Sequence, residues 1–171
     1  MRNPIRRAAL FLLVALFLLP ACSSEEKKSQ ALKAPAFSLL TADGGRTIRL
    51  DDYKGKVLIL DFWATWCPPC KQEIPHFNAL YEEYKRKGLE ILGVSVDQGG
   101  ASIVQNYMES NPRSIVPSYP VAMASREITI AYGPISSIPV TFIIDRKGNV
   151  QQRLIGYQDK EVFEGIIQKL L

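Results

Sequence analysis

The chain has 171 residues, with 21 Lys and Arg against 17 Asp and Glu, and 47% of its residues are apolar. This length supplies one compact domain, and the apolar and aromatic content excludes an intrinsically disordered chain. A net charge of +4 does not by itself indicate a nucleic-acid-binding surface, because the position of the basic residues decides what the charge means.

The first 21 residues have the pattern of an export signal. Three arginines precede an apolar run over residues 8–19, which is shorter than the ~18 apolar residues that span a bilayer. The run ends in Leu-Pro-Ala-Cys at residues 19–22, which resembles the lipobox of bacterial lipoproteins. We therefore predict cleavage before Cys22 and lipidation of its sulfur, with a simple secreted protein cut near Ala21, or an uncleaved anchor, as alternatives.

Removal of residues 1–21 leaves 18 basic and 17 acidic side chains, so the apparent basicity mostly belongs to the signal. The stretch over residues 23–30 is wholly polar and cannot bury itself, which predicts a tether over residues 22–33. The folded domain is expected to span residues 34–171. Because its charges nearly balance, no nucleic acid is expected as a partner.

The domain combines strand and helix patterns. In the first half we predict, in chain order, a hairpin of residues 37–40 and 47–50, a buried strand over 57–63, a helix over 68–87 and a second buried strand over 89–96. Two shorter helices are predicted over 101–109 and 126–131, with a short strand at 119–122 between them. The chain then forms a hairpin of 139–144 and 150–155 and an amphipathic helix over 159–171. This order implies a mixed sheet with helices on both faces.

The chemistry is concentrated between the first buried strand and its helix, in Trp66-Cys67-Pro68-Pro69-Cys70. Two thiols three residues apart in the first turn of a helix lie on one face and can form a disulfide, and the free amides of the helix N-terminus favour the anion of the first sulfur. The prolines fit the helix start, where a missing amide costs little. We therefore predict a redox pair with Cys67 as the thiolate nucleophile.

Three other interpretations of the two cysteines remain open. A structural disulfide would close a tiny loop and constrain the unfolded chain little. A zinc site needs about four ligands, and the sequence offers only Cys22 and His76 besides the pair. Unreactive buried thiols fit poorly with a strand-to-helix junction that carries two prolines. Redox chemistry is the favoured interpretation, with no metal or cofactor, and His76 is expected to be passive.

The stretch from Asp61 to Cys70 resembles the active site of the thioredoxin superfamily. Four further segments are similar to the membrane-tethered TlpA/ResA/CcmG branch: Ala34-Pro35-Ala36-Phe37, the Asp43-Gly44 turn, Tyr53-Lys54-Gly55-Lys56, and Glu73 with Pro75. This resemblance covers residues 34–171. It implies a thioredoxin fold with an N-terminal β-hairpin extension and a central insertion within residues 97–131, and the activity of an exported thiol-disulfide oxidoreductase.

The resemblance also implies roles for individual residues. Cys67 would attack a substrate disulfide and Cys70, the buried partner, would resolve the mixed disulfide. Ile138-Pro139 resembles the family's cis-proline junction, where the backbone before the proline pairs with a bound peptide. Trp66, Pro68 and Pro69 would contact substrate as well, whereas Trp63 is expected in the core.

Two carboxyl groups are candidates for proton transfer to or from the resolving cysteine. Asp61 interrupts an apolar strand, where burial would raise its pKa. Thioredoxins have an acid at the matching position, whereas many relatives on the ResA side have Asn there and rely on the acid that matches Glu73. A solvated carboxylate at the helix start is the alternative for Glu73, as is a role in substrate choice.

Two other protein classes share parts of this pattern. A peroxiredoxin-like thiol peroxidase would need Pro at Leu60 and Thr at Ala64 to complete its Pro-x-x-x-Thr-x-x-Cys signature. A Sco-like copper-delivery module would need Cys-x-x-x-Cys and a distant histidine, but no histidine follows His76. Both are kept as alternatives to the oxidoreductase.

The resemblance favours a reductant of protein disulfides, for example in cytochrome c maturation, with apocytochrome c or maturation factors as substrates. A membrane thiol-disulfide carrier would supply the electrons. We expect a monomer in the bacterial cell envelope, lipid-anchored to a membrane with its domain on the periplasmic side.

Overall fold

The computed structural model describes residues 32–171. The predicted signal peptide, the lipidation of Cys22 and most of the tether fall outside the described residues. Within residues 32–171, no helix is both long and apolar enough to cross a membrane.

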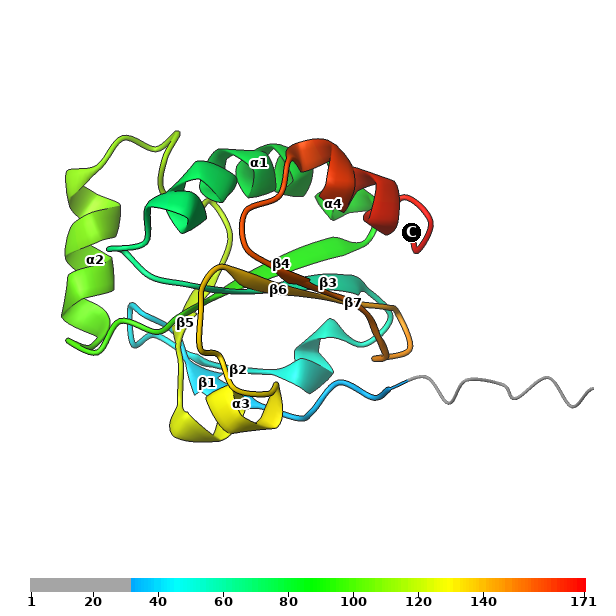
Figure 1. Ribbon diagram of the computed structural model, residues 1–171, viewed down its shortest axis with the longest axis horizontal. Helices are drawn as coiled ribbons and strands as arrows, with labels where there is room; N and C mark the ends of the chain where they lie inside the picture. Colours follow the sequence, from blue (N-terminus) through cyan, green and yellow to red (C-terminus); the bar gives the residue numbers. More distant parts are fainter. Residues whose placement is uncertain (1–31) are drawn as a thin grey trace, which may run out of the picture.

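A five-stranded mixed sheet forms the centre of the domain (Figure 1). Its strand order is β5-β4-β3-β6-β7, with β5, β4 and β3 parallel and with β6 and β7 antiparallel to their neighbours. The strands are β3 (Val57–Trp63), β4 (Leu89–Ser95), β5 (Val121–Met123), β6 (Val140–Ile144) and β7 (Val150–Ile155). The central position of β3 explains its continuous apolar sequence, because all seven residues are buried and both faces of the strand are covered.

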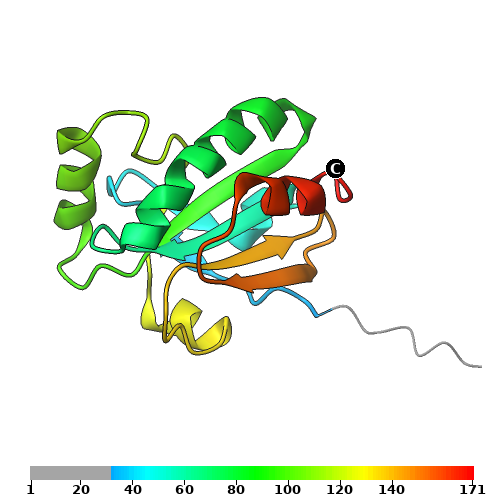
Figure 2. The same cartoon turned by 45° about the horizontal axis from the view of Figure 1, so that its top comes forward.

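Helices α1 (Pro68–Tyr84) and α4 (Lys160–Ile167) cover one face of the sheet (Figures 1 and 2). The short 3-10 helix η2 (Lys85–Lys87) follows α1 and leads into β4. Alternate residues of β3, among them Val57 and Ile59, point into this layer, where Phe77 of α1 and Phe163 of α4 pack with ring centroids 4.8 Å apart. This layer fixes α1, and therefore the start of α1, against the sheet.

The opposite face is covered by the N-terminal hairpin and a short helix. The covering elements are β1 (Ser38–Leu40), β2 (Thr47–Arg49), the 3-10 helix η1 (Leu50–Tyr53) and α3 (Arg126–Ala131). Leu58, Leu60 and Phe62 of β3 point into this layer, and Tyr132 packs there against Phe62 with ring centroids 5.9 Å apart. The predicted thioredoxin-like fold with helices on both faces and an added N-terminal hairpin is confirmed.

Helix α2 (Ala101–Ser110) lies at the end of the sheet where β4 ends and α1 begins (Figure 1). Val104 of α2 packs in a third apolar cluster with Trp63, Cys67 and Cys70. Helix α2 and the loop after it occupy the segment in which a central insertion was predicted, so this insertion helps to enclose the two cysteines.

Most predicted elements agree with the structure within one residue, but three predicted boundaries were wrong. The helix predicted over residues 68–87 is α-helical only to Tyr84, and its last three residues tighten into the 3-10 helix η2 before Gly88. The strand predicted at residues 119–122 is β5 at Val121–Met123. The carbonyl of Pro120 still accepts the Gly93 amide of β4, but proline has no amide with which to extend the ladder toward residue 119. The final helix was predicted over residues 159–171 but ends at Ile167, after which the chain closes in tighter turns.

Candidate active site

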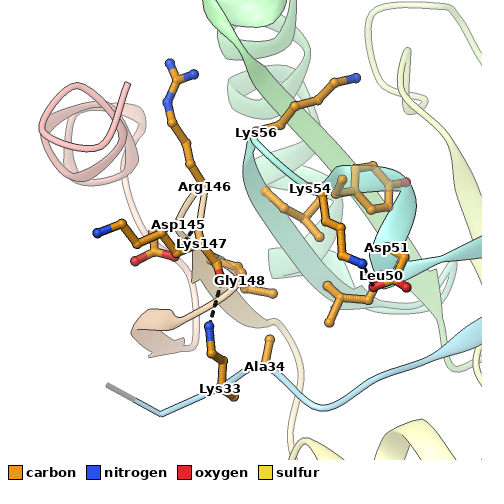
Figure 3. Close-up of a pocket in the computed structure, with 13 residues that line it drawn as sticks. Lys33, Ala34, Leu50, Asp51, Lys54, Lys56, Asp145, Arg146, Lys147 and Gly148 are labelled. Carbon is orange, nitrogen blue, oxygen red and sulfur yellow. Dashed lines mark hydrogen bonds and ion pairs between the residues drawn. The ribbon is translucent and has the colours of Figure 1, made fainter. Parts of the chain in front are cut away.

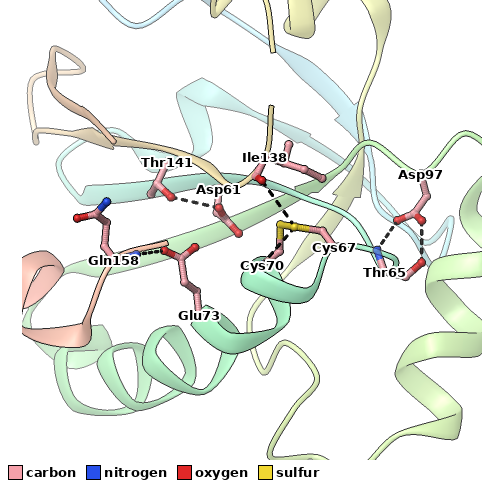
Figure 4. The surroundings of a disulfide bond; sticks show 9 residues. All are labelled: Asp61, Thr65, Cys67, Cys70, Glu73, Asp97, Ile138, Thr141 and Gln158. Atoms are coloured by element: carbon pink, nitrogen blue, oxygen red, sulfur yellow. Dashed lines mark hydrogen bonds between the residues drawn. A yellow bond between two sulfur atoms is a disulfide. The ribbon is translucent and has the colours of Figure 1, made fainter. Parts of the chain in front are cut away.

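Cys67 and Cys70 form a disulfide at the N-terminus of α1 (Figure 4). Cys67 is the N-cap of the helix, and its Sγ accepts a hydrogen bond from the Cys70 amide at 3.2 Å. Pro68 and Pro69 occupy the first helical positions, whose amides have no partner within the helix. The helix start therefore directs an amide and the positive end of its dipole at the Cys67 sulfur, which favours a thiolate there after reduction.

The predicted cis-proline junction faces the disulfide. The Ile138-Pro139 peptide bond is cis, as expected, and the Ile138 carbonyl oxygen lies 3.8 Å from Cys67 Sγ. Both cysteines are almost inaccessible, with 3% of Cys67 and 1% of Cys70 exposed. The Ile138 backbone therefore borders Cys67, whereas Cys70 is enclosed.

A groove of about 500 Å³ opens next to Cys67. Trp66 forms part of its wall and is 63% exposed, whereas Trp63 is 1% exposed in the core, as predicted for both. The other lining residues, besides Cys67, are Pro68, Pro69, Val96, Gln98, Ile135, Ser136, Ser137 and Ile138. The groove brings together every residue that the sequence proposed for substrate contact except the buried Pro139.

Asp61 lies within β3 on the face covered by α1. It is 1% exposed, and its Oδ1 accepts a hydrogen bond from the Thr141 hydroxyl of the neighbouring strand at 3.2 Å. Burial raises the pKa of Asp61 to about 7, and the Thr141 hydrogen bond only partly offsets this. A carboxyl group with this pKa is only partly ionised at neutral pH.

Glu73 lies one helical turn beyond Cys70 and is fully buried, so the solvated alternative considered for it is wrong. Its Oε1 accepts the Gln158 amide at 2.7 Å, whereas its Oε2 is buried with no partner among the described residues. Burial and, to a lesser extent, the nearby charge of Asp61 together raise the pKa of Glu73 to about 8, against the lowering effect of the Gln158 amide.

The pKa values of Asp61 and Glu73 are both raised above those of ordinary surface carboxyl groups. Figure 4 shows both on the side of the disulfide that carries Cys70, and each has a pKa near neutrality. A group with such a pKa can both accept and return a proton at the pH at which exchange occurs. This environment is suited to proton transfer with the enclosed cysteine.

Asp97 is a residue of the site that the sequence reasoning missed. It is buried just after β4, and its carboxylate accepts the Thr65 amide at 3.0 Å, the Thr65 hydroxyl at 2.7 Å and the Ser95 hydroxyl at 2.7 Å. These bonds fix the loop that carries Trp66 and Cys67 to the end of β4. The signal in the sequence was an acidic residue directly after a buried strand, at the sheet edge where α1 begins.

His76 is only half-buried, and its ring lies against Tyr157 with centroids 5.8 Å apart. Its Nδ1 is buried with no partner in the part of the chain that the structure describes. Among residues 32–171, no group of three or more His, Cys, Asp and Glu side chains is arranged to hold a metal ion.

A disulfide at the first turn of α1 in a thioredoxin-like fold, facing a cis-proline, defines a thiol-disulfide oxidoreductase. Comparison with known proteins agrees: the chain belongs to the AhpC/TSA family, whose model matches residues 31–153. The thiol-disulfide oxidoreductases ResA of Bacillus cereus and Bacillus anthracis are each 36% identical to it over 148 residues, which cover 86% of this chain and 82% of theirs.

Solved structures show the same fold. A thioredoxin-family thiol:disulfide interchange protein of Chlorobium tepidum has a TM-score of 0.72 and 35% identity, covering 83% of this chain and 97% of that one. StoA of Bacillus subtilis has a TM-score of 0.63 and 27% identity, covering 77% of this chain and 96% of that one. The chain is thus a ResA-like thiol-disulfide oxidoreductase, as the resemblance in the sequence implied.

Proposed function

We propose that this protein is an exported, lipid-anchored reductant of protein disulfides in the cell envelope. The observation that carries this proposal is the Cys67–Cys70 disulfide, which is almost wholly buried, lies beside the Ile138 backbone and has two buried carboxyl groups on its Cys70 side. Such a site suits an extended polypeptide that places its own disulfide beside Cys67.

The reaction begins with the reduced protein. The Cys67 thiolate attacks one sulfur of the client disulfide, so that a new S–S bond joins Cys67 to the client and the other client sulfur leaves as a thiolate that takes up a proton. The Cys70 amide at the helix start stabilises the Cys67 anion before the attack. The Ile138 backbone holds the client segment during this step.

The second step needs the Cys70 thiolate. Asp61 or Glu73, each ionised in part near neutral pH, accepts the Cys70 proton. Cys70 then attacks Cys67, the Cys67–Cys70 disulfide forms, and the second client sulfur leaves as a thiolate and is protonated. Two electrons and two protons have passed to the client, and a membrane dithiol carrier would return the protein to its reduced form.

The family resemblance supports reduction of client disulfides rather than their oxidation. It also supports apocytochrome c or its maturation factors as the clients. The envelope location is supported by the export signal and lipobox-like residues 19–22. Mass spectrometry of the mature N-terminus tests the anchor directly: a diacylglyceryl group on Cys22 is expected, and an unmodified N-terminus near Ala21 would contradict it.

The client is identified by trapping. Cys70→Ser, expressed in the native host, leaves Cys67 able to form a mixed disulfide that cannot be resolved, and the trapped proteins are identified by mass spectrometry. The matched control is Cys67→Ser, which leaves Cys70 enclosed and should trap little. Enrichment of apocytochromes or maturation factors is expected, whereas a broad set of secreted proteins would indicate general disulfide repair.

The direction of electron flow is tested by the reduction potential. The reduction potential of a reductant is expected to be close to that of thioredoxin, about −270 mV, and far from that of the strong oxidant DsbA, about −120 mV. Equilibration with glutathione or dithiothreitol, with the Cys67–Cys70 disulfide followed by Trp66 fluorescence, gives the value. A result close to that of DsbA would contradict the proposed direction.

The proton-transfer roles are tested by pH profiles of disulfide exchange. Asp61→Asn and Glu73→Gln keep the size of each side chain and remove the titration, so each should flatten the rise of the resolution rate between about pH 6 and pH 8. The exposed residue Glu109 of α2 offers a matched control as Glu109→Gln. Unchanged profiles in both site variants would remove the proposed role.

A further inference from the structure

A second hollow lies at the opposite end of the domain and has no part in the redox chemistry. It has a volume of about 240 Å³ and lies between the start of β3, η1 and the turn between β6 and β7 (Figure 3). Five basic side chains line it, against two acidic ones: Lys33, Lys54, Lys56, Arg146 and Lys147 against Asp51 and Asp145. The hollow is therefore basic, although the charges of the domain as a whole nearly balance.

The acidic groups in and around the hollow are already engaged. Asp51 pairs with Lys54 at 3.1 Å, and Glu90 beside the hollow pairs with Lys56 at 2.7 Å. Asp145 accepts hydrogen bonds from the amides of Lys147 and Asn149 within its own turn. Within the described residues, neither Lys33 nor Lys147 forms an ion pair, and both are exposed, so their charges face solvent.

The basic character continues onto the neighbouring surface. Arg146 donates to the Lys87 carbonyl at 3.2 Å and to the Gly55 carbonyl at 3.3 Å, which joins η2 to the rim of the hollow. All three residues of η2, Lys85–Lys87, are basic and exposed. The side chains of the hollow and η2 together form what we call the basic end of the domain.

The basic end is also where the tether meets the domain. Lys33 is the second described residue, and its Nζ donates to the Lys147 carbonyl at 2.8 Å. Nine residues lie between Cys22 and Leu32, and the ten Cα-to-Cα steps from one to the other span at most about 35 Å. A lipid on Cys22 would therefore keep this end of the domain close to the membrane surface.

The disulfide lies at the other end of β3. Lys56 directly precedes β3 and Cys67 follows it, so the strand separates the basic end from the redox site by its length, about 20 Å. We propose that the basic end binds the phosphate headgroups of anionic phospholipids and thereby orients the anchored domain with its redox site directed away from the bilayer. This inference rests on the lipid anchor proposed above.

The proposal is tested with vesicles and a protein that carries no lipid. Residues 23–171 suffice, because the apolar clusters lie within residues 32–171 and the solved relatives consist almost wholly of the matching region. Sedimentation with phosphatidylcholine vesicles containing 30% phosphatidylglycerol should show binding at low salt, and vesicles of phosphatidylcholine alone should not. Each lysine near an anionic surface contributes about fivefold in affinity.

Lys33→Gln combined with Lys147→Gln is therefore expected to weaken vesicle binding about 25-fold, whereas Lys33→Arg with Lys147→Arg should retain it. The matched control is Arg113→Gln with Arg126→Gln, which removes the same charge from exposed positions at the α2 end and on α3. Equal weakening in the two Gln pairs would show unspecific attraction and overturn the proposal.

Inorganic phosphate separates a lipid surface from a site for free anions. At constant ionic strength, 1 mM inorganic phosphate should leave vesicle binding unchanged, and displacement by it would overturn the lipid assignment. Disulfide exchange by the lysine variants should equal that of the parent, since Lys33 and Lys147 lie a strand's length from Cys67. If the parent protein failed to bind the anionic vesicles while its disulfide exchange was intact, the basic surface would be refuted and the oxidoreductase activity would stand.

Discussion

Asp61→Asn offers a sharp test of the electrostatics behind the disulfide. Asp61 is 1% exposed in β3, and its burial raises the pKa from the ordinary 3.8 to about 7. A raised pKa means that the folded protein binds the proton more tightly than the unfolded chain does. The resulting stabilisation is complete below about pH 4 and is lost as the pH rises through about 7.

The magnitude follows from the size of the shift. Three pKa units at 1.36 kcal/mol each correspond to about 4 kcal/mol of unfolding free energy lost between pH 4 and pH 8. Asparagine has nearly the same shape, can still accept the Thr141 hydroxyl, and does not ionise. If the two proteins are equally stable below about pH 4, Asp61→Asn should exceed the stability of the parent by about 2 kcal/mol at pH 5 and by about 4 kcal/mol at pH 8.

Urea unfolding of the oxidised protein, followed by tryptophan fluorescence at pH 5, 6, 7 and 8, gives these differences. Glu109→Gln, an exposed change on α2, should show the same dependence of unfolding free energy on pH as the parent over the whole range. If the unfolding free energy of Asp61→Asn also changed with pH as that of the parent does, Asp61 would titrate as an ordinary carboxylate. The proton transfer proposed for it would then lose its physical basis.

Three further changes test the packing around the site. Thr65→Val removes the hydroxyl that donates to Asp97 at 2.7 Å and should cost about 1–3 kcal/mol and slow disulfide exchange, which Thr65→Ser should preserve in kinetic assays. Gly93→Ala would place a methyl group 3.0 Å from Trp63 Nε1 and should lower the unfolding free energy measured in urea by about 1–3 kcal/mol. An unchanged urea midpoint of unfolding would show that the indole can move aside. Phe163→Ala should cost about 3–5 kcal/mol in the same assay, since the ring is fully buried, and a smaller loss would mean that the layer between α1 and α4 collapses around the cavity.

The sequence predicted the elements that local patterns define. Strand β3 was predicted with its observed bounds, because a continuous apolar run has few other structures available, and α3 was predicted with its observed bounds at Arg126–Ala131. The errors lie at the edges: β5 is only three residues long, and the last four residues of the chain form turns after α4. At these positions the local sequence pattern is weak, and the hydrogen bonds of the sheet or the tertiary packing determine where the element begins or ends.

The site divides in the same way. Cys67 and Cys70 were found from their spacing and their place between strand and helix. The Asp97 bonds to Thr65 and the Gln158 bond to Glu73 join segments 32 and 85 residues apart, so no local pattern contains them. Their effects, a fixed loop and a buried carboxyl group, depend on how the chain folds back on itself.

The burial of the disulfide has a consequence for its redox state in the cell. With 3% of Cys67 and 1% of Cys70 exposed, small thiols in the surroundings have little access to either sulfur. A polypeptide that fills the groove beside Ile138 can place its sulfur in line with Cys67, whereas a free cysteine gains no such contacts. The oxidation state of this protein would then be set by the partners it recognises, and would stay insulated from the ambient thiol pool.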